Sequence, residues 1–346
     1  MIKQKYILRC FELALKGMGN TSPNPLVGCV IVYNDNIIGE GYHQQYGKAH
    51  AEVNAINAVV DKSLLKDSTL YVNLEPCVHH GKTPPCVDLI LKYNIPNIVI
   101  ANSDPFEKVN GGGIDKLKAL GCKVYVEICK DEGRFLNRRF FTFHEKKRPY
   151  IILKWAQTLD GFIDVDRSNK NSRYKYWITN DKCRMLVHKW RSEESAIMIG
   201  ANTALNDNPQ LNVREWVGKN PVRIVIDENN CLNTNLNIFD GSVETLIFSP
   251  KKLKIPNTEF IEIDFAKPII PQIINVLFER NIISVIIEGG KMLLTSFIEN
   301  NIWDEARVLV GNKEFTKGVK APSLLLDYDE TLKLDEDNIY FYYNHL

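Results

Sequence analysis

Three potential zinc ligands and one glutamate constrain this chain more than any other feature. His50 and Glu52 stand at the start of a helical pattern, and Cys77 and Cys86 follow an apolar strand pattern further along the chain. Imidazole and thiolate are ligands that zinc prefers, usually about four in a tetrahedron. Three protein ligands leave one position open, which is typical of a catalytic zinc. The sequence therefore predicts a zinc site held by His50, Cys77 and Cys86.

Glu52 lies two residues beyond His50, within the first turn of the predicted helix. From there its carboxylate can reach a water at the metal without binding the metal itself. A glutamate in that place can take a proton from the water and deliver it to a leaving amine. We predict that Glu52 is the catalytic acid and base.

Two alternative roles for this group of residues stay open. The two cysteines can be buried apolar residues without a metal, as cysteines often are. Alternatively, His79 or His80 can complete a structural zinc site, which would leave Glu52 without a role.

Length and charge set the broad class. A chain of 346 residues is long enough for two domains. The formal net charge is only +1, which argues against a protein that holds nucleic acid mainly by bulk electrostatics. A small anionic substrate needs only a local cluster of Arg or Lys, so it remains compatible with this charge.

The chain is expected to work in a reducing, cytoplasmic environment and not at a membrane. No uncharged apolar run approaches the ~20 residues that span a bilayer. The first residues form an amphipathic helical pattern that Arg9, Glu12 and Lys16 interrupt, unlike a signal peptide. The eight cysteines are therefore not expected to form a disulfide framework.

Both halves of the chain alternate strand and helix patterns, which predicts an α/β protein. In the first half we expect helices at 3–16, 50–60, 85–93 and 113–120, and strands at 26–33, 36–42, 69–73, 98–101 and 123–127. In the second half we expect helices at 181–191 and 291–299, and strands at 150–155, 196–199, 223–227, 245–248 and 284–287. The charged stretch 145–149 is the predicted linker, so the domains are expected at 1–146 and 147–346.

The order His-x-Glu, Pro-Cys, Cys is similar to the zinc nucleobase-deaminase signature, although the two cysteines lie nine positions apart here instead of three. The stretch 75–86, together with 21–28 and 41–52, resembles the bifunctional deaminase/reductase family of riboflavin biosynthesis. This resemblance implies a cytidine-deaminase-like three-layer α/β/α domain in the first half. It also implies that Asn24 and His43 contact the substrate, although a turn-forming Asn and a surface His would look the same.

The second half resembles the reductase part of the same family. The matching segments are 154–161, 177–179 with Arg191, 200–209 with Leu211 and Arg214, 222–227, and the turn Glu288-Gly289-Gly290 that opens a helix. The resemblance implies a dihydrofolate-reductase-like α/β domain. The second half lacks a Gly-x-Gly-x-x-Gly motif, so a Rossmann fold is not indicated.

The resemblance also implies how the reductase residues divide between cofactor and substrate. The cofactor NADPH would contact Ala156, Trp177, Thr203 and Asp207, with its phosphates held by Gly290, Lys291, Met292, Leu293, Leu294, Thr295 and Ser296. The substrate would contact Arg191, Leu211, Arg214 and Glu288. Arg suits a phosphate because its guanidinium can donate two parallel hydrogen bonds. A solvated surface Arg is the alternative for both arginines.

One segment departs from the family pattern. The stretch 165–176 is longer than usual and places Lys175 where the family has a small Ser. A substrate contact at Lys175 is therefore doubtful, and Ser172 or Arg173 can take its place.

The sequence thus predicts a bifunctional enzyme of riboflavin biosynthesis. Its first domain would use Zn²⁺ to deaminate 2,5-diamino-6-(5-phosphoribosylamino)pyrimidin-4-one, and its second domain would use NADPH to reduce the ribosyl group to ribityl. We expect a homo-oligomer that binds a small phosphorylated pyrimidine but no nucleic acid and no membrane. The competing hypotheses are a tRNA adenosine deaminase with an RNA-binding second domain, and a non-catalytic zinc-stabilised binding protein.

Overall fold

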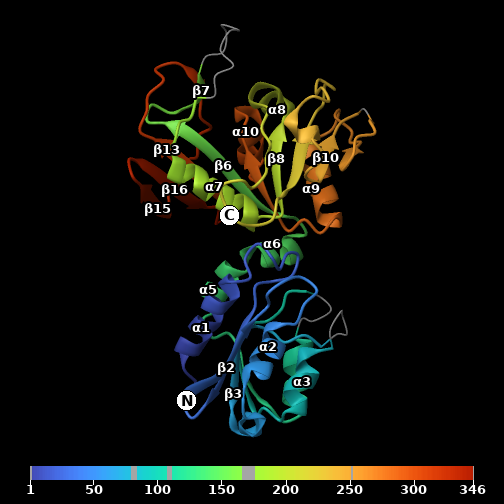
Figure 1. The fold of residues 1–346 in the computed structure, drawn as a ribbon, viewed down its shortest axis with the longest axis vertical. Helices are drawn as coiled ribbons and strands as arrows, with labels where there is room; N and C mark the ends of the chain where they lie inside the picture. The colour runs from blue at the N-terminus through green and yellow to red at the C-terminus, as the bar shows by residue number, and fades with distance from the viewer. Residues whose placement is uncertain (1, 79–83, 107–110, 166–175, 251, 346) are drawn as a thin grey trace. The chain divides into compact units, whose positions relative to one another are not determined.

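The computed structural model describes residues 2–78, 84–106, 111–165, 176–250 and 252–345. The chain divides into two compact units, Met1–Lys147 and Arg148–Leu346 (Figure 1). Each unit has its own sheet and its own apolar core.

The first unit is built on a five-stranded sheet. Its strands are β1 (Gly28–Tyr33), β2 (Asn36–Tyr42), β3 (Thr69–Leu74), β4 (Asn97–Asn102) and β5 (Lys123–Tyr125), in the order β2-β1-β3-β4-β5. β1 is antiparallel to β2 and β3, whereas β3, β4 and β5 are parallel. Asn34 and Asp35 join β1 to β2 with φ of 46° and 63°. Two positive φ angles are typical of the type I′ turns that close tight hairpins.

Helices cover both faces of this sheet, which makes the unit a three-layer sandwich. They are α1 (Gln4–Leu15), α2 (Ala51–Ala58), α3 (Cys86–Lys92), α4 (Gly112–Ala119), α5 (Lys130–Leu136) and α6 (Arg138–Lys146), with a 3₁₀ turn at Lys62–Asp67. One face of the sheet packs against the apolar side of α1. The other face packs against α2, α3 and α4, and the predicted ligands His50 and Cys86 lie at the starts of α2 and α3.

A glycine brings α2 close to the sheet. A Cβ atom at Gly41 in β2 would lie 2.3 Å from the backbone N of Ala55, so only glycine allows this approach. The start of α2, with His50 and Glu52, is thereby held near the end of β2.

The second unit is built on a nine-stranded mixed sheet. Its strands, in the order β11-β10-β9-β8-β12-β6-β13-β16-β15, are Thr258–Ile261, Thr245–Phe248, Val222–Ile226, Ala196–Gly200, Ser284–Glu288, Tyr150–Thr158, Glu305–Gly311, Asp337–Tyr343 and Glu330–Leu334. The strands from β11 to β13 are parallel, and β13, β16 and β15 are antiparallel. A separate ribbon pairs β7 (Phe162–Val165) with β14 (Gly318–Lys320).

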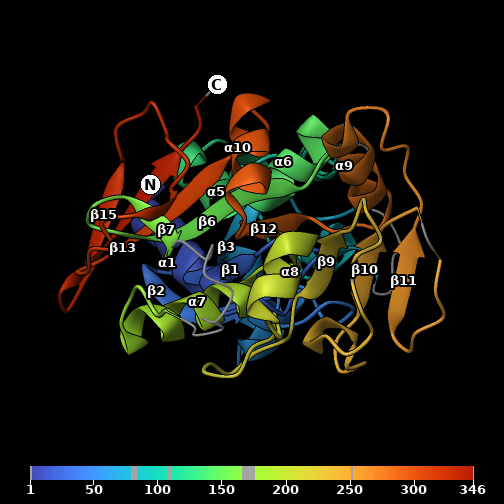
Figure 2. The same ribbon diagram turned by 90° about the horizontal axis from the view of Figure 1, so that it is seen from above.

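Helices again cover both faces of this sheet. α7 (Asp181–Glu193) and α8 (Ala201–Asp207) lie on one side, and α9 (Ile269–Glu279) and α10 (Lys291–Glu299) lie on the other (Figure 2). Buried side chains of α7 and α8 pack in one core cluster with the sheet, and those of α9 and α10 pack in another. A 3₁₀ turn at Asn237–Phe239 follows β9.

The structure corrects and extends the expected element map. The predicted linker at 145–149 is wrong in its first residues, because Glu145 and Lys146 belong to α6. This helix is anchored by the buried Phe140, Phe141 and Phe143, a cluster whose spacing does not show helical periodicity clearly. The helices α5, α6, α8 and α9 and the strands β7, β11, β13, β14, β15 and β16 were not expected from the sequence.

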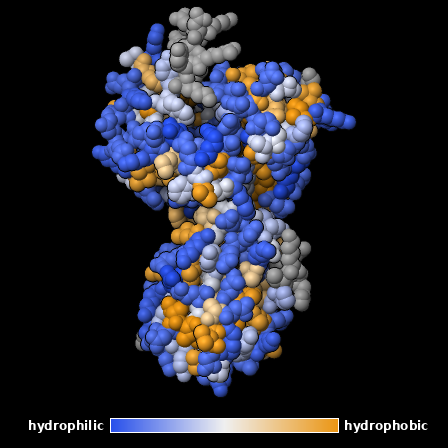
Figure 3. All heavy atoms as spheres, viewed as in Figure 1, coloured by the Kyte–Doolittle hydropathy of each residue, from blue (hydrophilic) through white to orange (hydrophobic). Residues whose placement is uncertain are grey.

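Within the described ranges, no helix is both long enough and apolar enough to cross a bilayer. Polar side chains cover most of the face drawn in Figure 3, and apolar ones lie there in several separate groups.

Candidate functional site

Three elements of the first unit bring the predicted zinc ligands together. His50 precedes α2 with an extended backbone, Cys77 follows β3, and Cys86 is the first residue of α3. The Nδ1 atom of His50 lies 3.5 Å from Sγ of Cys77 and 3.3 Å from Sγ of Cys86. Ligands bound tetrahedrally to one zinc at ~2.0–2.3 Å lie roughly 3.6 Å apart. The donor set therefore fits a zinc ion in both chemistry and spacing.

The electrostatics of the two cysteines favour metal binding. The hydrogen bond with Cys86 and the interaction with His50 together outweigh burial and lower the pKa of Cys77 to about 4. The backbone N–H of Cys86 also donates to Sγ of Cys77 over 3.4 Å. Because the thiolate is the form that binds metal, the site is arranged to hold a thiolate at Cys77.

Glu52 is buried beside these ligands, in the first turn of α2. Burial raises its pKa to about 7, and the neighbouring Cys77 adds to this effect whereas His50 opposes it. A carboxyl group whose pKa lies near the working pH can accept a proton in one step and release it in another. Glu52 therefore has the position and the environment of a general acid and base.

Asn24 and His43 form a hydrogen-bonded pair next to His50. Nδ2 of Asn24 lies 3.1 Å from Nε2 of His43, and Nδ1 of His43 lies 3.1 Å from the carbonyl O of Ala49. The rings of His43 and His50 meet edge to face at 5.4 Å. A carbonyl oxygen only accepts, so Nδ1 of His43 carries the proton and Nε2 accepts from the amide of Asn24. His43 is buried, whereas Asn24 is partly exposed and keeps its own Oδ1 for another partner.

Two buried acids near Cys77 were not predicted from the sequence. Glu75 accepts hydrogen bonds from the backbone N–H groups of Asp104, Gly111, Gly113 and Ile114. It thereby fixes the start of α4 beside the strand end that carries Cys77. Burial raises the pKa of Asp104 to about 7, with smaller effects of Glu75 and Cys77. The only available sequence signal was their place at the ends of adjacent strands, which is typical of site residues in α/β sheets.

Some sequence predictions lie outside the described residues. These are the possible fourth ligands His79 and His80, and the departing segment with Ser172, Arg173 and Lys175.

In the second unit, Glu288 ends β12 between two buried cations. Its carboxylate lies 2.9 Å from Nζ of Lys154 in β6 and 2.9 Å from Nη2 of Arg191 in α7. Burial alone raises the pKa of Glu288, but Arg191 and Lys154 outweigh burial and lower it to about 2. Glu288 is thus a firmly held anion. Lys154 belongs to this cluster although the sequence singled it out only as part of a motif.

The two predicted substrate arginines differ in their surroundings. Arg191 is buried, and it donates to Glu288 and to the carbonyl O of Asn212. Arg214 is exposed, and its Nη1 donates to Oδ1 of Asn212. The third predicted contact, Leu211, is buried with a φ of 51°. Of the two guanidinium groups, that of Arg214 is the more accessible to an anion.

The turn after β12 forms a cradle with α8. Gly289 and Gly290 have φ of 89° and 74°, and a Cβ at Gly289 would lie 3.0 Å from Cγ2 of Thr203. The first N–H groups of a helix have no partner within it and attract phosphate. At this edge α10 begins at Lys291 and α8 at Ala201, after the neighbouring parallel strands β12 and β8. The turn and these helix starts are therefore candidate phosphate-binding groups.

The other predicted cofactor residues lie on different elements around this edge. Ala156 is half-buried in β6, Asp207 ends α8, and Trp177 is exposed with the guanidinium of Arg184 5.0 Å from its ring. In α10, Lys291 and Met292 are exposed. Leu294 is fully buried and its N–H donates to the carbonyl O of Gly290, so its side chain faces the core. Leu293, Thr295 and Ser296 are partly exposed.

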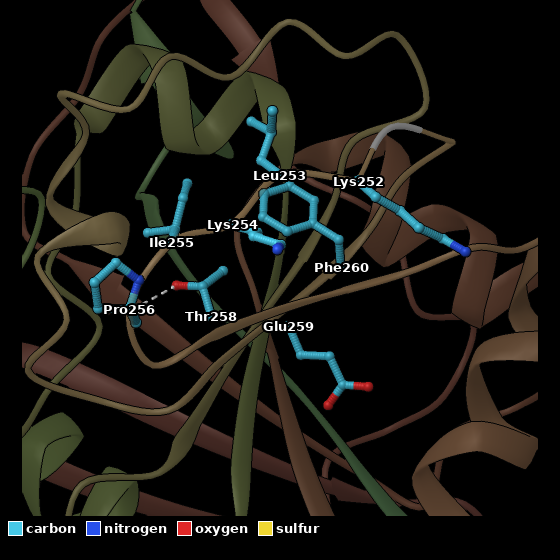
Figure 4. A pocket seen from close by; sticks show the side chains of 8 residues that line it. All are labelled: Lys252, Leu253, Lys254, Ile255, Pro256, Thr258, Glu259 and Phe260. Atoms are coloured by element: carbon cyan, nitrogen blue, oxygen red, sulfur yellow. Dashed lines mark hydrogen bonds between the residues drawn. The ribbon is translucent and has the colours of Figure 1, made fainter.

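A wide-open surface pocket of about 610 Å³ lies elsewhere in the second unit, lined by residues 252–256 and 258–260 (Figure 4). None of the predicted site residues lines it. It therefore adds nothing to either site.

Comparison with known proteins gives two family matches. Residues 149–338 match the RibD C-terminal domain, and residues 1–102 match the cytidine and deoxycytidylate deaminase zinc-binding region. The riboflavin biosynthesis protein RibD of Aquifex aeolicus is 36% identical over 98% of this chain and 95% of its own length. That of Bacillus amyloliquefaciens is also 36% identical, over 94% of this chain and 88% of its own length.

Solved structures agree with these matches. A diaminohydroxyphosphoribosylaminopyrimidine deaminase/5-amino-6-(5-phosphoribosylamino)uracil reductase from Thermotoga maritima superposes with a TM-score of 0.87 and 34% identity, covering 98% of this chain and 97% of its own. One of the structures of Acinetobacter baumannii RibD superposes with a TM-score of 0.88 and 30% identity, covering 98% of each chain. The predicted fold class is confirmed: a cytidine-deaminase-like domain is followed by a dihydrofolate-reductase-like domain. The comparisons do not support the tRNA deaminase alternative.

Proposed function

Because the chain belongs to the RibD family of bifunctional deaminase/reductase enzymes, we propose that residues 1–146 form its deaminase domain and residues 147–346 its reductase domain. The enzyme acts in riboflavin biosynthesis, with Zn²⁺ and NADPH as cofactors. It deaminates 2,5-diamino-6-(5-phosphoribosylamino)pyrimidin-4-one and then reduces the ribosyl group to ribityl.

In the deaminase domain, His50, Cys77 and Cys86 would hold the zinc ion. Zinc, when bound, supplies a Lewis acid that makes water a nucleophile at neutral pH. Glu52 takes the proton that the attacking water loses and delivers it to the departing amino group, which leaves as ammonia. Asn24, held by His43, turns its Oδ1 toward the substrate and accepts from a base N–H.

In the reductase domain, the cradle of Gly290 and Thr203 would hold the cofactor phosphates. NADPH, when bound, supplies the hydride. Glu288 accepts hydrogen bonds from sugar hydroxyls, and Lys154 and Arg191 keep its carboxylate charged and oriented. Arg214 binds the 5′-phosphate. Holding both partners in one orientation supplies much of the rate enhancement in such a transfer.

The observation that carries the deaminase assignment is the convergence of three ligand atoms within 4.8 Å of one another, beside the buried Glu52. The test follows both half-reactions with the full chain. Ammonia release from the diaminopyrimidinone should come first, and loss of the reduced-nicotinamide absorbance should follow only when the deaminated product has formed. NADPH oxidation without prior ammonia release would contradict the proposed order.

For the reductase assignment, the test is Arg214→Ala. A charge-assisted hydrogen bond contributes ~1.5–3 kcal/mol, so loss of this side chain should raise KM for the substrate about tenfold or more. NADPH affinity and ammonia release should not change. If NADPH binding weakened while KM held, Arg214 would belong to the cofactor site.

We further propose that the enzyme is cytoplasmic and forms homo-oligomers. The eight free cysteines are typical of a reducing compartment. The exposed strand β15 at the edge of the second sheet offers unpaired backbone groups to another chain. Light scattering of the purified protein gives the oligomeric state, and fractionation of cells gives the compartment.

A further inference from the structure

His188 is an uncharged side chain buried in a cluster of charges. It lies in α7, one turn before Arg191, and its side chain is almost fully buried. The charged groups that act on it are Arg191, Arg214, Glu215 and Glu288. Its Nδ1 lies 3.2 Å from the backbone N of Arg214.

The geometry determines the protonation state of this ring. A backbone N–H only donates, so Nδ1 of His188 must be an unprotonated acceptor and the ring proton must be on Nε2. Burial, together with the positive charges of Arg191 and Arg214, lowers the pKa of His188 to about 4. This pKa agrees with a neutral ring. The hydrogen bond to Arg214 is therefore present throughout the physiological pH range.

Together with Arg191, His188 fixes the segment that carries Arg214. Nη1 of Arg191 donates to the carbonyl O of Asn212 over 3.3 Å, while His188 accepts from the N–H of Arg214. The helix α7 thus holds this segment at two backbone points. Leu211 anchors the start of the segment in the core, and Oδ1 of Asn212 accepts from the side chain of Arg214.

We propose that His188 is a positioning residue for substrate binding: its neutral Nδ1 fixes the backbone of Arg214 so that the guanidinium faces the 5′-phosphate. This inference rests on the proposed role of Arg214. A neutral acceptor is required here, because a charged side chain would lose the hydrogen bond and add a cation against Arg191 and Arg214.

The test compares two substitutions in the full-length protein. His188→Leu introduces an apolar side chain of similar size that has no acceptor. In His188→Asn, the amide Oδ1 can replace Nδ1 as the acceptor. We expect His188→Leu to raise the reductase KM for the deaminated, phosphorylated substrate about tenfold, the effect of one lost contact to a charged ligand. The kcat value, NADPH affinity and ammonia release should stay near wild type. The KM of His188→Asn should lie close to the wild-type value.

Two further measurements separate positioning from a general structural role. The same ribosylaminouracil without its 5′-phosphate should show no difference between wild type and His188→Leu. The double variant His188→Leu/Arg214→Ala should bind the phosphorylated substrate no worse than Arg214→Ala alone. If His188→Leu does not fold, His188→Ala replaces it in both measurements.

The outcomes distinguish this inference from the proposed function. If Arg214→Ala leaves KM unchanged, the proposed phosphate site is wrong and the inference is overturned with it. If Arg214→Ala raises KM but His188→Leu does not, only the inference is overturned. Equal losses of substrate and NADPH affinity in His188→Leu would also overturn it, because they would indicate general damage.

Discussion

Replacing Glu288 with Gln removes the anion that holds Lys154 and Arg191 together. All three side chains are largely enclosed, with exposed side-chain fractions of 17%, 11% and 10% respectively. Glu288→Gln keeps the shape of the side chain but leaves two enclosed cations without their carboxylate. Breaking one partner of a buried ion pair typically costs ~3–5 kcal/mol.

The pKa of Glu288 gives a second, independent magnitude. The pKa falls from 4.5 to about 2 in the folded state, and each pKa unit corresponds to ~1.4 kcal/mol. The ionised carboxylate therefore stabilises the folded state by roughly 3 kcal/mol relative to the protonated carboxyl group. Because the folded pKa is the lower one, this stability is fully present above pH 4.5. It is lost as the pH falls from 4.5 toward 2.

The tryptophans allow this change in unfolding free energy to be measured in the second unit. All five lie between residues 155 and 303, so their fluorescence reports unfolding of the second unit alone. At pH 7 the urea unfolding free energy of Glu288→Gln should be about 3 kcal/mol below that of wild type. The difference should shrink as the pH is lowered below 4.5, because Glu288 then takes up a proton in the unfolded wild-type chain while it stays ionised in the folded protein until the pH approaches 2.

The exposed Glu299 in α10 provides a matched control. Glu299→Gln should leave the unfolding free energy within ~0.5 kcal/mol of wild type, and ammonia release should be normal in both variants. The reasoning is refuted if Glu288→Gln is as stable as wild type at pH 7. It is also refuted if the difference in unfolding free energy between wild type and Glu288→Gln does not depend on pH between 4.5 and 3.

Three other substitutions test the remaining parts of the two sites. Cys86→Ala should contain much less than one zinc per chain by elemental analysis, and full zinc content would remove Cys86 from the ligand set. Glu52→Gln should keep its zinc and lose deamination by ~10²–10⁴-fold, while reduction of added deaminated substrate continues; near-normal ammonia release would exclude the proton-transfer role. Gly289→Ala should weaken NADPH binding about tenfold or more, since its φ is 89° and the added Cβ would lie 3.0 Å from Thr203. Gly161→Ala, with a φ of 80° but open space around it, is the matched control, and equal NADPH affinity in the two variants would argue against a phosphate cradle.

The sequence was most informative where the site is built from local segments. His50 directly precedes α2, Glu52 lies in the first turn of α2, and Cys86 opens α3, so the helix pattern alone places them at helix starts. Their convergence with Cys77 required only that the helices pack on the same sheet. Asp104 and Glu75 could not be found in this way because their roles depend on hydrogen bonds between distant loops.

The antiparallel end of the second sheet could not be predicted from hydropathy. β15 is exposed along nearly its whole length, and Leu332 and Leu334 are its only apolar residues. It forms because its backbone pairs with β16, and β16 pairs with β13. Pairing of this kind is decided by tertiary context and leaves a weak sequence pattern.

Two arginines that look alike in the sequence acquire different roles through this fold. Arg191 and Lys154 outnumber Glu288 by one charge. Arg184 stands apart from this group, because it pairs with the carboxylates of Asp181 and Glu215. The exposed Arg214 adds a second positive charge nearby, as its electrostatic coupling to Arg191 shows. His188 stays neutral, so Lys154, Arg191 and Arg214 exceed Glu288 by two charges, which matches a phosphate monoester dianion. A chain with a net charge of +1 can therefore still attract an anionic substrate, because the excess is concentrated around one helix.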